Sequence, residues 1–194
     1  MNRTLAALMM SVAALSTALT AAPALAQSAK GPSHVVSPQP LPIDDSRPRV
    51  FLGGSIDMGG APDWQAAMTA ALADMDVVIL NPRRPDWNPN WRPEADEPEF
   101  RRQVEWELAA LESADVIVMY FAPGTQSPVS LLEMGLHARG GKLIVLAPEG
   151  FWRKGNIDIT AQAYGVKQVQ SLPELTAAVR EALSNAAARG RFAR

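Results

Sequence analysis

The residue best placed to carry out chemistry is Glu133, which lies in the stretch Ser127–Ala138. Ser127 is a suitable N-cap and Pro128 a suitable first helical residue, so a helix is expected to begin here. This helix would follow directly on an apolar strand, with Glu133 near its positive end. Open α/β sheets bind their ligands at this place, outside the carboxyl ends of the strands.

Two interpretations of Glu133 remain open from this stretch alone. Helical spacing places Glu133 in an otherwise apolar stripe with Val129 and Leu136, where a carboxylate is either paired or reactive. Alternatively, Glu133 and His137 form a surface pair at i, i+4 spacing, which is worth about 0.3 kcal/mol. The stretch favours neither interpretation.

A second group of candidate ligand-binding residues lies in the loop 82–98. Prolines at five positions stiffen this loop: 82, 85, 89, 93 and 98. Loops of this length in compact domains are usually lids, binding loops or disordered segments. An indole ring on a stiff loop can stack on a flat ligand such as a nucleobase, with Arg83 near its polar edge, and we expect this of Trp87. The alternative, that the rings fold back on the domain, is expected for Trp91.

Two glycines, Gly53 and Gly54, follow the first expected strand. Because they carry no side chain, they let backbone N–H groups approach a ligand. However, the sequence Gly-Gly-Ser-x-Asp is neither a dinucleotide-binding fingerprint nor a P-loop. A tight turn without a ligand explains the two glycines equally well.

The elements that would position these residues alternate between strands and helices. Apolar runs predict strands at 50–52, 76–81, 115–121, 142–147 and 166–169, and helical spacing predicts the helices between and after them. This alternation predicts one α/β domain of the Rossmann-like or flavodoxin-like kind, with a five-stranded parallel sheet and helices on both faces. In that architecture, the loops that leave the carboxyl ends of the strands converge on one rim. These loops are 53–60, 82–98, 122–127 and 148–158.

The N-terminus indicates export. Residues 1–26 combine a basic start, an apolar run and small residues before a cleavage site at about Ala26/Gln27, which is typical of a secretory signal peptide. The mature protein is therefore expected to be secreted or periplasmic. Residues 27–47 are expected to be a flexible leader, 48–186 the domain and 187–194 a basic tail.

The composition excludes several classes of site. The chain has 18 Lys and Arg, 20 Asp and Glu, and no Cys. This balance argues against a nucleic-acid-binding protein, and no membrane association is expected after signal cleavage. No metal site or cofactor is expected, because thiolates are absent, His34 lies in the leader and His137 stands alone.

Several motifs together resemble those of a known enzyme family. They are Phe51–Gly54, Asn81–Arg84, Ser113–Val116, Pro123–Thr125, Leu132–Ala138 and Gly155–Asp158. Over about residues 50–169, the chain resembles the nucleoside 2-deoxyribosyltransferases and their broader relatives.

The resemblance implies that Glu133 is a nucleophile that attacks C1′ of a nucleoside and forms a covalent glycosyl-enzyme. A second base, or water, would then attack the same carbon. Glu107, where the family usually carries an aspartate, would protonate the leaving base. Asn156 matches a position that reaches into a neighbouring subunit's site to hold the sugar, so a homo-oligomer with shared active sites is implied.

Three positions depart from the family pattern. Phe51 stands where well-studied members have a tyrosine that orients the nucleophile, and Ser127 stands where an aspartate often binds the sugar. Glu107 is one methylene longer than the usual aspartate. A site with these changes could accept ribosides, or favour water over an acceptor base. The expected substrate-binding residues are Gly53, Gly54, Asp57, Arg83, Trp87, Ser127, Asn156 and Asp158.

The resulting prediction is retaining N-glycosyl transfer on nucleosides, either between nucleobases or to water. The export signal favours hydrolysis, because free acceptor bases should be scarce outside the cytoplasm. A first alternative is a module of the same fold that binds a nucleoside or nucleotide without chemistry. A second is a structural domain, which would pack Trp87 and Trp91 away from the rim.

Overall fold

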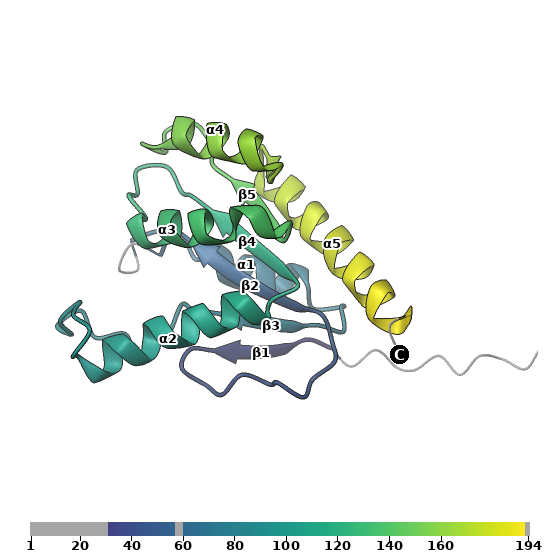
Figure 1. The fold of residues 1–194 in the computed structure, drawn as a ribbon, viewed down its shortest axis with the longest axis horizontal. Helices are drawn as coiled ribbons and strands as arrows, with labels where there is room; N and C mark the ends of the chain where they lie inside the picture. The colour runs from purple at the N-terminus through teal and green to yellow at the C-terminus, as the bar shows by residue number, and fades with distance from the viewer. Residues whose placement is uncertain (1–30, 57–59, 193–194) are drawn as a thin grey trace, which may run out of the picture.

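Short apolar runs form the strands of a parallel sheet that lies between two layers of helices (Figure 1). The computed structural model describes residues 31–56 and 60–192. Its strands are β1 (Ser33–Val36), β2 (Arg49–Gly54), β3 (Val78–Asn81), β4 (Val116–Tyr120), β5 (Leu143–Leu146) and β6 (Lys167–Val169). Its helices are α1 (Trp64–Ala71), α2 (Pro98–Ser113), α3 (Pro128–His137), η2 (Ala138–Gly140), α4 (Lys154–Tyr164) and α5 (Leu172–Phe192).

The sheet has six strands in the order β1-β3-β2-β4-β5-β6, and every neighbouring pair is parallel. Apart from β1, this is the flavodoxin-like order, in which the chain direction across the sheet reverses between β2 and β4. The predicted α/β architecture is therefore confirmed. Ligands in such sheets bind where the order reverses, so the carboxyl ends of β2 and β4 mark the place to examine.

Alternate side chains of the central strands enter two separate cores. Phe51, Ile117 and Met119 pack with α2, α3 and α4 on one face of the sheet. Val50 and Leu52 pack with α1 and α5 on the other face. Figure 1 shows the same division, with α2, α3 and α4 in front of the sheet and α1 behind it. Because both faces are covered, β2 to β5 are almost wholly apolar and buried.

The sixth strand is a correction to the expected five. β1 lies within the segment 27–47, so the prediction of a flexible leader is wrong for residues 31–47. β1 pairs with β3 along its whole length, and Arg47 ties the return to β2 through ion pairs with Asp45 and Asp76. The composition did not reveal this strand, because an edge strand needs one partner only and its side chains are half buried.

The C-terminal end differs as well. Residues 187–192 continue α5, so the expected basic tail is helical up to Phe192. In the part of the chain that the structure describes, no helix is both long and apolar enough to span a membrane. The expected signal peptide, residues 1–26, lies outside the described residues.

Candidate active site

Glu133 is buried at the carboxyl end of the sheet, with only 7% of its surface exposed. Its inward neighbours on α3 are Ser130 and Met134, while Val129 and Leu136 are more than half exposed. The expected apolar stripe around Glu133 is therefore wrong, since the apolar residues face outward and the glutamate inward. The surface pair with His137 is wrong too, because the Glu133 side chain is shielded from water.

The orientation of α3 is fixed by its first turns. Ser130 Oγ donates a hydrogen bond of 2.9 Å to the carbonyl of Gly54, at the end of β2. Met134, one turn further along, packs in the core between α3 and the sheet. Glu133 lies on the same face as these two residues and is consequently directed inward.

Glu107, in the third turn of α2, faces the same site. The low polarity around its carboxyl raises the pKa of Glu107 to about 7. Burial, together with the charge of Glu107, raises the pKa of Glu133 to about 8. Because both pKa values are raised and the charge of Glu107 opposes ionisation of Glu133, the pair carries at least one proton near neutral pH. Such a pair is suited to proton transfer and to nucleophilic attack.

Three hydroxyl groups join the ends of β2 and β4 beside the start of α3. Ser55 Oγ lies 2.7 Å from Thr125 Oγ1 and 2.6 Å from Ser127 Oγ, and it accepts a hydrogen bond from the backbone N–H of Ala122. Ser127 has φ +46° and is the only non-glycine residue with positive φ among those the structure describes. Strained backbone of this kind is concentrated at binding sites. Sequence reasoning missed Ser55 and Thr125, although both are hydroxyl residues at strand ends on the rim.

The two glycines of β2 have a packing reason of their own. A Cβ atom on Gly54 would lie 2.3 Å from the carbonyl oxygen of Tyr120 on β4, and Gly54 has φ +123°. A Cβ atom on Gly53 would lie 3.0 Å from the ring of Phe51. The close approach of β4 thus accounts for Gly54 and the Phe51 ring for Gly53, and the role expected for both glycines in ligand binding stays a prediction.

Replacing Gly54 with Ala is expected to destabilise the fold by roughly 3 kcal/mol or more, because the new side chain meets backbone and φ is unfavourable. The matched control is Gly155→Ala in α4, where a Cβ atom meets nothing within 4 Å. Thermal unfolding followed by circular dichroism compares the two variants. A Gly54→Ala variant as stable as Gly155→Ala would contradict the close approach of β2 and β4.

The loop after β3 forms its own cluster. Trp87 and Trp91 pack edge to face at 5.2 Å, and the Arg84 guanidinium lies 5.0 Å from the centre of the Trp91 ring. Arg83 donates to the carbonyls of Ala61 and Pro62 and so clamps the loop before α1. Arg83 is therefore engaged by protein atoms, and stacking of Trp87 on a ligand stays a prediction.

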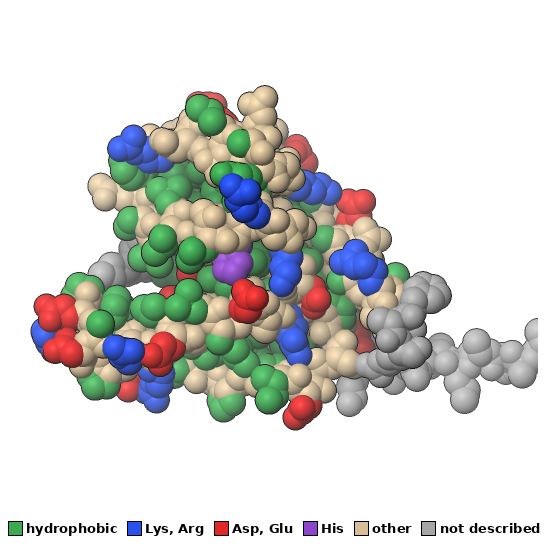
Figure 2. Space-filling view, viewed as in Figure 1, with side chains coloured by type: hydrophobic (Ala, Val, Ile, Leu, Met, Phe, Trp, Pro, Cys, Tyr) green, Lys and Arg blue, Asp and Glu red, His purple; other side chains and the backbone are tan. Residues whose placement is uncertain are grey.

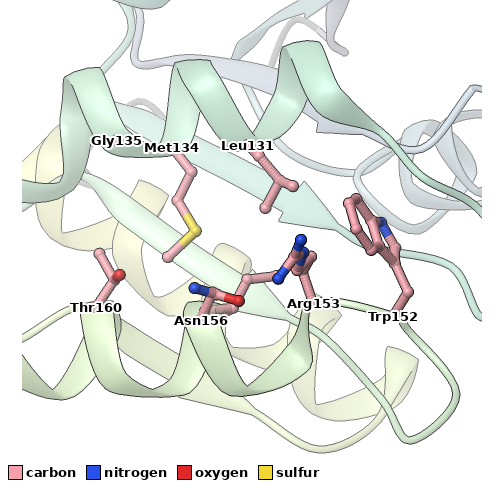
Figure 3. Close-up of a pocket in the computed structure, with 8 residues that line it drawn as sticks. Leu131, Met134, Gly135, Trp152, Arg153, Asn156 and Thr160 are labelled. Atoms are coloured by element: carbon pink, nitrogen blue, oxygen red, sulfur yellow. The ribbon is translucent and has the colours of Figure 1, made fainter.

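Asn156 lies on α4 and lines a groove whose lining does not include Glu133. This groove, of about 280 Å³, lies between α3 and α4 and is also lined by Met134, Trp152 and Arg153. In Figure 3, Asn156 extends from α4 toward the Met134 side chain. Ile159, which lies about one helical turn after Asn156 on α4, is exposed.

The remaining expected site residues divide into two cases. Asp158 is held by Lys154, whose Nζ lies 2.6 Å away and lowers the Asp158 pKa, and by a 2.8 Å hydrogen bond from Gln168. It is thus occupied within its own chain. Asp57 lies outside the described residues. Phe51 is fully buried in the core and carries no hydroxyl that could orient Glu133.

The sequence also matches a known protein family. A family model described as "nucleoside 2-deoxyribosyltransferase like" matches residues 47–151, which is more than half of the chain. The chain belongs to the nucleoside 2-deoxyribosyltransferase-like family. Membership supports a role of the glycosyl-transfer kind and nucleosides as small-molecule partners.

One solved structure has a similar fold. A conserved protein from Enterococcus faecalis V583 is similar at a TM-score of 0.52, with 12% sequence identity, over 70% of this chain and 98% of that chain. At this identity the likeness supports the fold alone. No curated protein sequence matches the chain. Among the residues described in this nucleoside 2-deoxyribosyltransferase-like chain, no group of His, Cys, Asp or Glu side chains is arranged to hold a metal ion.

Proposed function

We propose that the protein catalyses retaining N-glycosyl transfer on nucleosides, through a covalent glycosyl-Glu133 intermediate. The observation that carries this proposal is the pairing of Glu133 with Glu107 at the point where the strand order reverses. The charge of Glu107 contributes to the raised pKa of Glu133, which supports the proposal that the two carboxyl groups act in one site. Retaining glycosyl transfer needs one carboxylate as the nucleophile and one acid for the leaving group.

The first step breaks the bond between the base and the sugar. A carboxylate oxygen of Glu133 attacks C1′, the C1′–N bond breaks, and its electron pair leaves with the base. Glu107 gives its proton to that base and becomes a carboxylate. In the second step a base or water attacks C1′, the bond to Glu133 breaks, and Glu107 takes up the proton of the attacking group.

This scheme requires the shared proton to move when substrate binds. In the free protein Glu107 accepts a hydrogen bond from Gln103, which favours its charged form. Among the described residues, no hydrogen bond reaches the Glu133 carboxyl, so the proton is better placed on Glu133. Positive charge that develops on the sugar favours the ionised form of Glu133, while the base nitrogen accepts the proton of Glu107. The raised pKa values thus make the proton mobile near neutral pH.

The hydroxyl groups of Ser55, Thr125 and Ser127 are suited to bind the sugar. They lie at the start of the helix that carries Glu133, and each can both donate and accept. Ser127 replaces a carboxylate usual in the family, so the sugar is held by weaker, uncharged bonds. Together with the expected export signal, this favours hydrolysis over transfer to a second base.

The test is release of free base from a panel of deoxyribonucleosides and ribonucleosides, with and without an added acceptor base. Chromatography detects the base, and mass spectrometry of the quenched protein detects a sugar adduct on Glu133. Release of base without any adduct would contradict the covalent glycosyl-Glu133 intermediate. If nucleosides raise the melting temperature but no base is released, and Glu133→Gln behaves like the wild type, the alternative of a non-catalytic binding module is correct.

We further propose that two chains share their active sites. The outward face of α3 carries Val129, Leu132 and Leu136, all more than half exposed, and Leu108 of α2 is exposed as well. Figure 2 shows hydrophobic side chains gathered along this face of the molecule. Isolated exposed apolar residues are ordinary, but an apolar face of this kind marks an association surface. The second copy would bring its Asn156 toward the sugar.

If two chains share their active sites, two variants that are inactive alone should restore activity when they are combined. Co-expressed Glu133→Gln and Asn156→Ala chains should recover roughly a quarter of the wild-type base release, because about half of randomly formed dimers are mixed and each has one intact site of two. Each variant alone should be nearly inactive. Activity that does not exceed the sum of the separate variants would place Asn156 in the site of its own chain, or outside any site.

A further inference from the structure

We propose that the N-terminal segment 31–47 is a working part of the active site, in which Ser37 and Gln103 act as positioning residues for Glu107. Ser37 fixes the side-chain amide of Gln103, and Gln103 fixes the carboxyl of Glu107, so that the proton of Glu107 faces the substrate. This inference rests on the proposed role of Glu107 as proton donor.

The contacts form one continuous chain of hydrogen bonds. Ser37, in the turn after β1, donates from Oγ to Gln103 Oε1 at 2.6 Å. Gln103 Nε2 donates to the Pro82 carbonyl at 3.0 Å and to Glu107 Oε1 at 2.9 Å. Ser37 is 3% exposed and Gln103 5% exposed, so solvent does not compete for these bonds.

The orientation of the amide follows from its partners. The carbonyl oxygen of Pro82 can only accept a hydrogen bond, so the nitrogen of the Gln103 amide must face it. The second N–H of that nitrogen then points to Glu107 Oε1, and the amide oxygen is left for the hydroxyl of Ser37. Both hydrogens and the oxygen of the amide are therefore satisfied, and a rotated amide would place its oxygen against the Pro82 carbonyl and lose that bond.

This orientation determines where Glu107 holds its proton. Oε1 accepts from Gln103 and cannot carry a hydrogen directed at the same N–H, so a protonated Glu107 holds its hydrogen on Oε2. The same bond favours the charged form and lowers the Glu107 pKa, against the larger opposing effect of burial. Gln103 thus makes Glu107 a stronger acid and frees its other oxygen for the leaving base. The titratable group that faces this pair from α3 is Glu133.

Ser37 comes from a part of the chain that lies before the family match, which begins at residue 47. A second bond holds this segment on α2: Trp106 Nε1 donates to the Gln39 carbonyl at 2.7 Å. The segment is therefore attached to α2 at two points, one of which leads to Glu107. The hydrogen bond at the other point ends on the backbone carbonyl of Gln39 and does not involve Gln103 or Glu107, so it supplies a matched control.

The test compares four variants of the full mature chain. Gln103→Leu removes the bond to Glu107, and Ser37→Ala leaves the Gln103 amide without its anchor. Ser37→Thr keeps the hydroxyl, and Trp106→Phe loosens the segment without touching Gln103. The Glu107 pKa is measured by NMR titration of carboxyl-labelled glutamate, with its signal assigned through Glu107→Gln. Base release is measured across pH in parallel.

The Glu107 pKa should rise in Gln103→Leu and, by less, in Ser37→Ala, and should stay at the wild-type value in Ser37→Thr and Trp106→Phe. Base release in Gln103→Leu should fall roughly tenfold, a part of the 100- to 10,000-fold that a positioned proton donor contributes, and its loss at high pH should move to higher pH. An unchanged pKa in Gln103→Leu, or equal shifts in Ser37→Ala and Trp106→Phe, would overturn the proposal. If the wild type releases no base while the pKa shifts appear, the proposed function fails and the positioning of Glu107 stands.

Discussion

Replacing Glu133 with Gln is expected to reduce base release by a factor on the order of 10,000, because the nucleophile is lost while the shape of the site is kept. No sugar adduct should form on the variant protein. Glutamine differs from glutamate in one atom, and at a position only 7% exposed it should leave the packing of α3 unchanged. Single-turnover chromatography of free base, with mass spectrometry of the protein, measures both effects.

Two further variants serve as a control for this result and as a test of the proton donor. Glu112→Gln makes the same chemical change at an exposed position near the C-terminal end of α2, and should release base at the wild-type rate. Glu107→Gln should lose activity on natural nucleosides and retain much of it on a deoxyriboside whose leaving group needs no proton. Full activity in Glu133→Gln would contradict the nucleophile, and equal losses on both substrates in Glu107→Gln would contradict the proton donor.

The second large effect concerns stability and pH. Burial and the charge of Glu107 raise the pKa of Glu133 from an ordinary 4.5 to about 8 in the folded protein. A carboxyl with a raised pKa stabilises the fold fully below pH 4.5, and this stability is lost as the pH rises through 8. Glu107 acts in the same direction, up to about pH 7. The free energy of unfolding should therefore fall by on the order of 7 kcal/mol between pH 4.5 and pH 8, about 4 kcal/mol of it from Glu133 and about 3 kcal/mol from Glu107.

Urea denaturation at several pH values measures this dependence, and Glu133→Gln removes most of it. The variant should be more stable than the wild type at pH 8 and similar to it at pH 4.5. Asp45, whose pKa Arg47 lowers to about 2, acts only below about pH 4 and does not affect the comparison. A wild-type protein whose stability does not fall over this pH range would show that the two carboxyl groups are better solvated than the structure indicates.

Much of the fold was predictable because its signals are local. The central strands are runs of apolar residues that stop at Gly, Asn or Pro, and this pattern identifies strands buried on both faces. The N-terminal edge strand was missed because half-buried side chains leave no such pattern. The strand is defined by its pairing with β3, which lies more than forty residues later in the chain, and the local sequence carries no signal for that pairing.

The site was predictable only in part, and α3 shows why. Its motif pointed to Glu133, but helical spacing indicated the wrong companions, because an apolar face can lie against a core or against a second chain. Val129 and Leu136 fit both cases in sequence, and the structure leaves them exposed. The bond between Ser37 and Gln103 joins residues 66 positions apart and carries no sequence signature. Contacts of this kind depend on the folded arrangement of whole elements.

The edge position of β1 also bears on solubility. β3 consists of four buried residues, and β1 covers the backbone groups along its outer side. A chain cut at residue 48, the boundary that composition suggests, would leave β3 with unpaired N–H and C=O groups beside apolar side chains. Exposed edges of that kind recruit strands from other molecules and lead to aggregation. The N-terminal strand thus replaces an apolar edge with a short, half-buried one, and a chain cut at residue 48 is expected to aggregate more readily than the full chain.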